Sequence, residues 1–461
     1  MTRSNAIAAA QAAFDDGRLW TTLARRVAMQ TASQPGGEAA DFGRYFEAEL
    51  VPDLEAMGFA CRVHPNPSGH QGRFLVAERV EDAGLPTVLT YGHGDVVPGY
   101  DDEWSSGGGP WTLTEREGRW YGRGAADNKG QHLINLEALK AVLAARGRLG
   151  FNVVALFEMG EEAGSPGLDA FCAANRDALR ADVLVASDGP RLRADRPTLF
   201  LGSRGIMTFD LELDLRDGSH HSGNWGGVLA NAGLVLAHVL ASIVTRSGQI
   251  RVVGWRPTNV PADVYRAVST LELDHAAGLP VVDPNWGEPG LTDGEKVYAW
   301  PSFQVLSFTC GNPELPANAI PSRAVARCEL RFVPPVTPDT VVPPLRAHLD
   351  ERGYGAVRIV PDKAVAATRL GPDHPLVAFA ADSILRTTGK RVTVLPNLGG
   401  SLPNAVFAET LGLPTLWVPH SYPGCRQHAA DEHVLPELLR EGLAMMAGLW
   451  WDVGEGLPPV R

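Results

Sequence analysis

The sequence predicts an α/β protein in which a mixed, mainly parallel sheet is flanked by helices and carries an inserted α+β domain. In the first half of the chain, short β-rich runs alternate with helical stretches, as in parallel sheets covered by helices. After Gly202 the pattern changes to alternating apolar and acidic residues, and from His374 the first pattern returns. We therefore expect the two outer parts of the chain to form one domain.

Strands of the outer domain are expected at residues 87–91, 151–157 and 182–187. Between the first two of these strands, residues 128–145 repeat leucine and valine at helical spacing, which predicts an amphipathic helix. A strand, a helix and a strand in this order are the unit from which parallel sheets are built.

The inserted domain begins with residues 206–215, IMTFDLELDL, which alternate like a strand with one wet face. A helical stretch, an irregular section rich in Pro and Trp, and a second strand follow, at residues 228–244, 253–300 and 323–333. A further helix and strand are expected within residues 335–359. The predicted division is 1–204 and 371–461 for the outer domain and 205–370 for the inserted one.

Composition limits the class of protein. The chain has 461 residues, of which 44% are hydrophobic and 20% charged, as in folded globular proteins, and the length favours more than one domain. The net charge of -12 and the lack of a Lys/Arg-rich run argue against a nucleic-acid partner. No apolar stretch is long enough for a membrane span.

The chain is expected to be cytoplasmic. Its first 25 residues include Asp15, Asp16 and Arg18 and lack the apolar stretch of a signal peptide. The five cysteines are an odd number at wide spacing, which favours reduced thiols over a disulfide framework. Because no CxxC pair is present, thiolate metal ligands are not expected.

Candidate metal ligands follow the predicted strands, at the edge where open α/β sheets place their sites. In YGHGD, His93 and Asp95 are two residues apart and point the same way in extended chain, so the carboxylate can orient the imidazole toward a metal. In GRGAADNKG, Asp127 and Asn128 open the predicted helix, and simple helix capping is the alternative role. The order GxxxxGK[ST] of a phosphate loop is absent.

Three more motifs complete the set. In FEMGEEAGS, the adjacent Glu161 and Glu162 follow a buried strand, so a cation or a proton must relieve their repulsion, and one ligand beside one general base is the natural division. Asp188 lies in SDG, where a turn aspartate is the alternative. His428 lies in QHAADE near the end of the chain. Together the five motifs could bind two zinc ions with one bridging carboxylate.

In this order, GHGDVVP, GRGAADNKG, EMGEEAGS, SDG and HAADE resemble the dinuclear zinc peptidases and amidohydrolases that include carnosinase-type dipeptidases, glutamate carboxypeptidase, aminoacylase and succinyl-diaminopimelate desuccinylase. The resemblance implies that His93 and Asp188 bind one Zn²⁺ ion. It implies that Glu162 and His428 bind a second Zn²⁺ ion and that Asp127 bridges the two. The outer domain would be the catalytic domain, and the inserted one the lid and dimerisation domain of a homodimer.

The same resemblance assigns Glu161 as general base and Asp95 as the residue that orients His93, and it implies a cis peptide bond between Asp127 and Asn128. His132, His420 and His433 have no assigned role and are interpreted as structural.

Further residues of the resemblance concern the substrate. In DGSHHSG, His221 resembles a histidine that reaches into the other subunit's active site, a register that rests on the Ser-Gly after it because residue 220 is also histidine. Asn318 and Arg331 resemble substrate-binding residues, and for Arg331 an ordinary edge-strand arginine is the alternative. Gly400 and Ser401 lie in GGSLP, which resembles the loop that meets the substrate carboxylate.

The expected activity is hydrolysis of an amide bond in a dipeptide or small peptide with a free carboxylate. In the family that the chain resembles, aspartate at the position of Asp188 is commoner in dipeptidases and aminopeptidases, so the resemblance favours a dipeptidase. An N-acyl-amino-acid amidohydrolase or a carboxypeptidase is the alternative. A catalytically silent metal-binding protein is a more remote alternative, since it would be expected to lack Glu161 or a ligand. Mn²⁺ or Co²⁺ could replace Zn²⁺.

Overall fold

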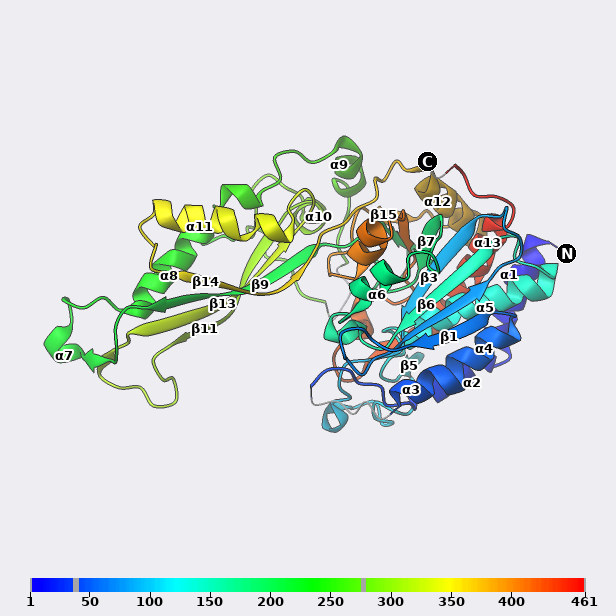
Figure 1. The fold of residues 1–461 in the computed structure, drawn as a ribbon, viewed down its shortest axis with the longest axis horizontal. Coiled ribbons are helices and arrows are strands. Elements are labelled where there is room, and N and C mark those ends of the chain that lie inside the picture. Colours follow the sequence, from blue (N-terminus) through cyan, green and yellow to red (C-terminus); the bar gives the residue numbers. More distant parts are fainter. Residues whose placement is uncertain (1, 36–40, 275–278, 460–461) are drawn as a thin grey trace.

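Two sheets organise the protein, one in each of the two lobes seen in Figure 1. The structure is a computed structural model that describes residues 2–35, 41–274 and 279–459. The larger lobe contains both chain ends, and the smaller lobe extends from it as an arm (Figure 1).

The larger lobe is built on an eight-stranded sheet in the order β1-β2-β6-β3-β7-β16-β8-β15. Its strands are β1 (Ala60–His64), β2 (Phe74–Arg79), β3 (Thr87–His93), β6 (Asn152–Glu158), β7 (Val183–Ala186), β8 (Thr198–Phe200), β15 (Thr393–Leu395) and β16 (Thr415–Trp417). β3 pairs in parallel with β6 and β7, as do β7 with β16 and β8 with β15. The other pairs are antiparallel, so the expected mixed, mainly parallel sheet is confirmed.

Helices cover both faces of this sheet, which explains why a central strand such as β6 is buried along its whole length. In β6, Val153 and Ala155 join the core beneath one group of helices, whereas Val154 and Leu156 face the opposite core. The first group comprises α1 (Arg3–Asp15), α2 (Arg18–Val27), α5 (Lys129–Arg146), α12 (Pro375–Thr388) and α13 (Pro436–Val453). The second comprises α6 (Leu168–Ala174), α9 (Ala262–Val268) and the π-helix η6 (Val406–Thr410).

Shorter elements complete the larger lobe. They are α3 (Phe42–Tyr45), the π-helix η1 (Phe46–Leu50), α4 (Val51–Ala56), the 3-10 turns η2 (Asp101–Glu103), η3 (Glu161–Ala163) and η7 (Pro423–Cys425), and a small sheet of β4 (Thr114–Arg116), β5 (Arg119–Tyr121) and β17 (His433–Val434). In this sheet β17 pairs with β5, so the last strand of the chain joins a hairpin that precedes α5.

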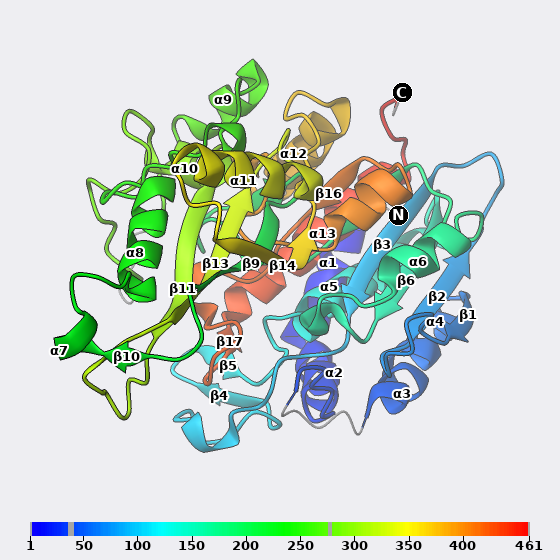
Figure 2. The same cartoon turned by 60° about the vertical axis from the view of Figure 1, so that its left-hand side comes forward.

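The smaller lobe is an antiparallel sheet of β11 (Ser302–Cys310), β13 (Arg323–Phe332), β9 (Gly205–Asp214) and β14 (Arg358–Val365), in that order. Along β9, Phe209, Leu211 and Leu213 are buried against α8 (Ala232–Ile243) and α11 (Val342–Glu351), which lie beside the sheet in Figure 2. The acidic residues between them are more exposed, as the alternating pattern predicts.

The remaining elements of the smaller lobe are the two-stranded pair β10 (His220–His221) and β12 (Ala319–Ile320), α7 (Ser222–Trp225), and the turns η4 (Val253–Trp255) and η5 (Pro338–Thr340). The inserted segment also contains α10 (Asp293–Tyr298). Part of the inserted segment packs elsewhere, because Val264, Val268 and Tyr298 join a core of the larger lobe. The division at residues 204/205 and 370/371 therefore stays a proposal.

The five cysteines all lie in the described ranges and are free thiols. No helix in the described part of the chain combines the length and the apolar character of a membrane span.

Asp452 connects the two ends of the chain, and its loss should destabilise the larger lobe. Its carboxylate accepts hydrogen bonds from Arg3 Nε at 2.9 Å, Ser383 Oγ at 2.5 Å and Arg386 Nη2 at 2.8 Å. Asp452 itself is buried although its arginine partners are partly exposed, so we take the lower end of the cost of breaking a buried ion pair, about 3 kcal/mol. We expect Asp452→Ala to lower the free energy of unfolding in urea by about that amount.

Asp15→Ala is the matched control, because the Asp15–Arg440 pair also joins α1 to α13 but is exposed to water. Equal midpoints for the two variants would contradict the structural role of Asp452.

Candidate metal centre

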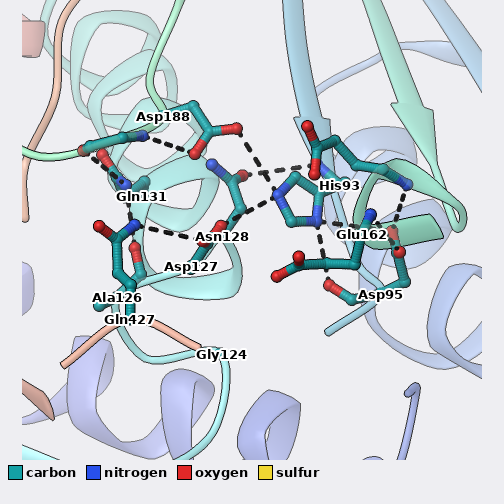
Figure 3. A network of polar contacts seen from close by, with 12 residues as sticks. His93, Asp95, Gly124, Ala126, Asp127, Asn128, Gln131, Glu162, Asp188 and Gln427 are labelled. Atoms are coloured by element: carbon teal, nitrogen blue, oxygen red, sulfur yellow. Dashed lines mark hydrogen bonds and ion pairs between the residues drawn. The ribbon is translucent and has the colours of Figure 1, made fainter. Parts of the chain in front are cut away.

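The five sequence motifs meet at one edge of the large sheet. His93 ends β3, Glu161 and Glu162 follow β6, and Asp188 follows β7. Because these strands are parallel, their carboxyl ends lie side by side. Figure 3 shows His93, between Asp127 and Glu162, with Asp188 above them.

The side chains form two groups of possible metal ligands that share Asp127, one with His93 and Asp188 and one with Glu162 and His428, and within each group the ligand atoms lie within 4.8 Å of one another. His93 Nε2 is 3.2 Å from Asp127 Oδ1 and 3.6 Å from Asp188 Oδ2. His428 Nε2 is 3.1 Å from Asp127 Oδ2 and 3.1 Å from Glu162 Oε2. Each oxygen of Asp127 therefore faces a different histidine.

The electrostatics of the cluster fit a bound cation. Burial, reinforced by the charge of Asp127, raises the pKa of Glu162 to about 7. Burial also raises the pKa of Glu161 well above its usual value, against the attraction of His93. The buried Oδ2 of Asp188 has no hydrogen-bond partner among the described residues. Imidazole and carboxylate donors are the ligands that Zn²⁺ prefers when thiolates are absent, so the residues fit such an ion.

The pKa values of His93 and His428 are shifted by the same carboxylates. Hydrogen bonds to Asp127 and Glu162 raise the pKa of His428 to about 11. Burial opposes charge on His93, but the hydrogen bond to Asp127 and the nearby carboxylate of Asp188 outweigh this effect and raise the pKa of His93. A proton on either ring occupies the place that a cation would take, because both neutralise the same carboxylates.

Asp95 acts on both sides of the cluster. Its backbone oxygen lies 3.0 Å from His93 Nδ1, nearer than its carboxylate oxygen at 3.5 Å. The carboxylate instead accepts hydrogen bonds from the backbone N–H of Glu161 at 3.1 Å and of Glu162 at 3.0 Å. Ser33 Oγ donates to the same carboxylate at 2.6 Å. Asp95 therefore orients His93 mainly through its main chain and holds the Glu161–Glu162 turn with its side chain.

Asp127 is held by residues to which the sequence analysis assigned no role. Glu432 Oε1 accepts hydrogen bonds from the backbone N–H of Gly124, Ala126 and Asp127, at 3.1, 2.9 and 3.1 Å. Gln427 Nε2 donates to Asp127 Oδ2 at 3.2 Å. Both residues flank His428 within the QHAADE motif, and their position next to a candidate ligand is the sequence feature that could have indicated a supporting role.

The alternative of helix capping is not what the structure shows. Asn128 is the residue before α5, but its side chain makes no cap hydrogen bond. Its amide nitrogen instead donates to the backbone oxygen of Ser187 at 2.8 Å, and its oxygen lies 3.1 Å from His132 Nδ1. The peptide bond between Asp127 and Asn128 is cis, as the resemblance implied.

Three of the expected substrate residues lie beside the centre. Arg331, Gly400 and Ser401 line a cavity of about 790 Å³ together with Glu161, Glu162 and His428. Arg331 is ion-paired with Glu329 at 3.0 Å, and its Nη1 donates to Ser401 Oγ at 3.4 Å.

The other two lie far away, at the tip of the smaller lobe. His221 is exposed in β10, directly before α7, and its ring accepts a hydrogen bond from Gly223 N at 3.1 Å. Asn318 O accepts from Ser222 N at 2.9 Å, beside α7, which Figure 1 places at the end of the arm farthest from the large sheet. A single chain therefore does not bring His221 or Asn318 to its own metal centre.

The unassigned histidines have structural contacts. His132 Nε2 lies 2.9 Å from the Tyr45 hydroxyl, and His420 Nε2 lies 3.1 Å from Ser187 Oγ. His433 Nε2 lies 2.6 Å from the Tyr422 hydroxyl.

Comparison with known proteins identifies relatives over most of the chain. Residues 89–452 match the model of peptidase family M20/M25/M40. A cysteinylglycine-S-conjugate dipeptidase of Corynebacterium striatum is 31% identical over 371 residues, 78% of this chain and 78% of that protein. A human Beta-Ala-His dipeptidase is 28% identical over 398 residues, 83% of this chain and 77% of the relative. The M20 metallo-carboxypeptidase Sso-CP2 of Sulfolobus solfataricus has a similar fold, with a TM-score of 0.79, 24% identity and coverage of 94% of this chain and 99% of that one.

We expect Zn²⁺ to stabilise the metal-free protein, because a cation removes the repulsion around Asp127. At 100 times its dissociation constant a ligand adds about 2.7 kcal/mol to the stability of the folded state. Differential scanning fluorimetry should show a rise in Tm that Asp127→Asn abolishes and that Asp195→Asn, at an exposed carboxylate, retains. The same rise in Asp127→Asn would mean that the ion binds elsewhere.

Proposed function

Because the chain belongs to peptidase family M20/M25/M40, we propose that it hydrolyses the amide bond of a dipeptide or small peptide at a centre of two metal ions. The observation that carries this proposal is the Asp127 carboxylate, one oxygen of which faces His93 and the other His428. The carboxylate and imidazole donors favour Zn²⁺, with Mn²⁺ or Co²⁺ as alternatives. The relationship to the dipeptidase of Corynebacterium striatum supports a dipeptide as substrate.

Glu161 is proposed as the general base. When bound, the metal ions would supply Lewis acidity that activates a water molecule and polarises the substrate carbonyl. Glu161 belongs to neither ligand group but lines both cavities that meet at the centre, so its carboxylate can reach a water molecule and the leaving group. It takes the proton of the water and later delivers it to the leaving amine.

Arg331 is proposed to bind the substrate's free carboxylate. Its guanidinium lines the same cavity as Glu161 and Ser401 and can form a bidentate ion pair, which fixes the amide that faces the metal ions. An N-acyl amino acid carries the same carboxylate, so a panel of dipeptides and N-acetyl amino acids separates a dipeptidase from the alternative deacylase.

The protein is further proposed to be a homodimer that assembles through the smaller lobe. β11 is an edge strand of the four-stranded sheet, and Val305, Leu306 and Phe308 on it are exposed apolar residues. An edge strand of this kind is a template for pairing with another chain. In such a dimer, His221 at the tip of one subunit would reach the metal centre of the other and donate a hydrogen bond to the developing oxyanion.

Glu161→Gln should abolish turnover and leave the metal content unchanged, because a general base is not a ligand. Glu162→Gln is the matched variant and should lower the metal content, since Glu162 belongs to a ligand group. Metal analysis of both purified proteins, with hydrolysis of a dipeptide, checks the assignment. Loss of about one metal ion per chain from Glu161→Gln would reverse the roles of the two residues.

Arg331→Ala should lower kcat/KM for substrates with a free carboxylate and have much less effect on C-terminal amides. Loss of a charge-assisted pair costs on the order of 2 kcal/mol, which is about thirtyfold in rate. Arg327→Ala is the control, because Arg327 lies on the same strand but pairs with Asp210 and Asp362. Equal losses on both classes of substrate would refute the anchoring role of Arg331.

His221→Ala should reduce kcat by a factor of about 10²–10³, the usual effect of an oxyanion donor, with unchanged metal content. When this inactive variant is mixed with inactive Glu161→Gln under conditions of proven subunit exchange, activity should return. The heterodimers have one site with an intact Glu161 and a His221 from the partner. A mixture that stays inactive would show that His221 does not act across subunits, and a fully active monomer would contradict the dimer itself.

A further inference from the structure

The metal centre opens into a second cavity that Arg331 does not line. This cavity has a volume of about 610 Å³ and reaches Asp127, Asp188, Glu161 and His428. It shares Glu161, Gly400, Ser401, Leu402 and His428 with the cavity that contains Arg331. The centre therefore lies between two spaces, one on each side of a substrate that has its carboxylate at Arg331.

The walls of the second cavity are mainly apolar. They include Leu192, Leu273, Leu279, Val282, Leu398 and Leu402. Leu192, Leu398 and Leu402 belong to the core of the larger lobe, so this wall is fixed by packing. Leu273 and Val282 come from the described residues between α9 and α10 and complete the apolar lining. A volume of this size is typical of small-molecule sites.

The charged groups of this cavity do not suit a substrate carboxylate. Arg191 lines it, but its guanidinium is buried and ion-paired with Glu441 at 2.7 Å. Arg331 is also ion-paired, with Glu329, but 28% of its side chain is exposed, whereas the Arg191 side chain is fully buried. The carboxylate end of a substrate is therefore favoured on the side of Arg331, and the acyl end on the apolar side.

We propose that the apolar cavity selects substrates with a large apolar group on the acyl side of the cleaved amide, such as an N-terminal Phe or Leu residue or an N-acyl group of similar size. This inference rests on the proposed amide hydrolysis and names its substrate class. The physical reason is the removal of apolar surface from water, which a Gly or Ala residue at the same position provides only in small part.

The first test compares Gly, Ala, Leu and Phe dipeptides that share one C-terminal residue, with the zinc-loaded protein. The value of kcat/KM should rise with the size of the first side chain, by at least about tenfold from Ala to Phe. The N-phenylacetyl derivative of the same C-terminal residue carries a similar apolar group but lacks the free amine. Its turnover therefore distinguishes an N-terminal residue from an N-acyl group as the preferred occupant of the cavity. Turnover of Ala and Phe dipeptides at equal rates would overturn the inference and leave the proposed function intact.

Two neighbouring valines give a matched pair of variants. Val282 lines the cavity, whereas Val281 does not line it and has 93% of its surface exposed. Val282→Asp should lower the ratio of kcat/KM for the Phe and Ala dipeptides about tenfold, because it places a charge against the apolar group. Val281→Asp should leave the ratio unchanged. An unchanged ratio in Val282→Asp would overturn the proposal.

A binding measurement tests the apolar cavity independently of the proposed reaction. In the Glu161→Gln protein, calorimetry should give tighter binding of the Phe dipeptide than of the Ala dipeptide, by about the same factor of ten. Equal affinities would overturn the inference. Failure of the zinc-loaded wild type to hydrolyse any of these amides would contradict the proposed function, and the binding comparison would still decide the role of the cavity.

Discussion

The candidate site depends on one constraint, the concentration of negative charge around the Asp127 carboxylate. Asp127, Glu162 and Asp188 belong, with two histidines, to two groups of possible metal ligands that share Asp127. The three carboxylates are buried, so water screens the repulsion between them only weakly. Such a cluster is tolerated only with protons or cations between the carboxylates. The raised pKa of His428 and the raised pKa of Glu162 have the same cause: the excess negative charge favours the protonated form of both side chains.

The surrounding fold keeps this cluster in place with contacts between distant parts of the chain. Glu432, near the end of the chain, binds the backbone N–H groups that lead to Asp127. Asp95, after β3, binds the backbone of Glu161 and Glu162 after β6. The carboxylates are thus fixed by hydrogen bonds to their main chain, so their positions do not depend on the cation alone.

The two lobes have different tasks in the proposed mechanism. The larger lobe, buried on both faces of its sheet, supplies the metal ligands from loops at the carboxyl ends of its strands. The smaller lobe brings Arg331 to the centre near its base and carries His221 at its tip. Leu273 and Val282 belong to the inserted part of the sequence but line the apolar cavity beside residues of the larger lobe.

Local sequence patterns predicted the strands β3, β6, β7, β9 and β13, because side-chain periodicity is a local property. Five motifs indicated the candidate metal ligands, whereas their division into two groups came from the family resemblance. The hydrogen bonds that Glu432 accepts from the backbone leading to Asp127, and the main-chain role of Asp95, became visible only in the folded protein. The tertiary structure also showed that α9 packs on the larger lobe and where the apolar cavity lies. The contacts of Glu432 with residues 124–127 and the packing of α9 join segments far apart in the sequence, and the orientation of His93 toward the main chain of Asp95 depends on the folded geometry. Local sequence patterns do not specify such contacts, because the contacts form only when the chain has folded.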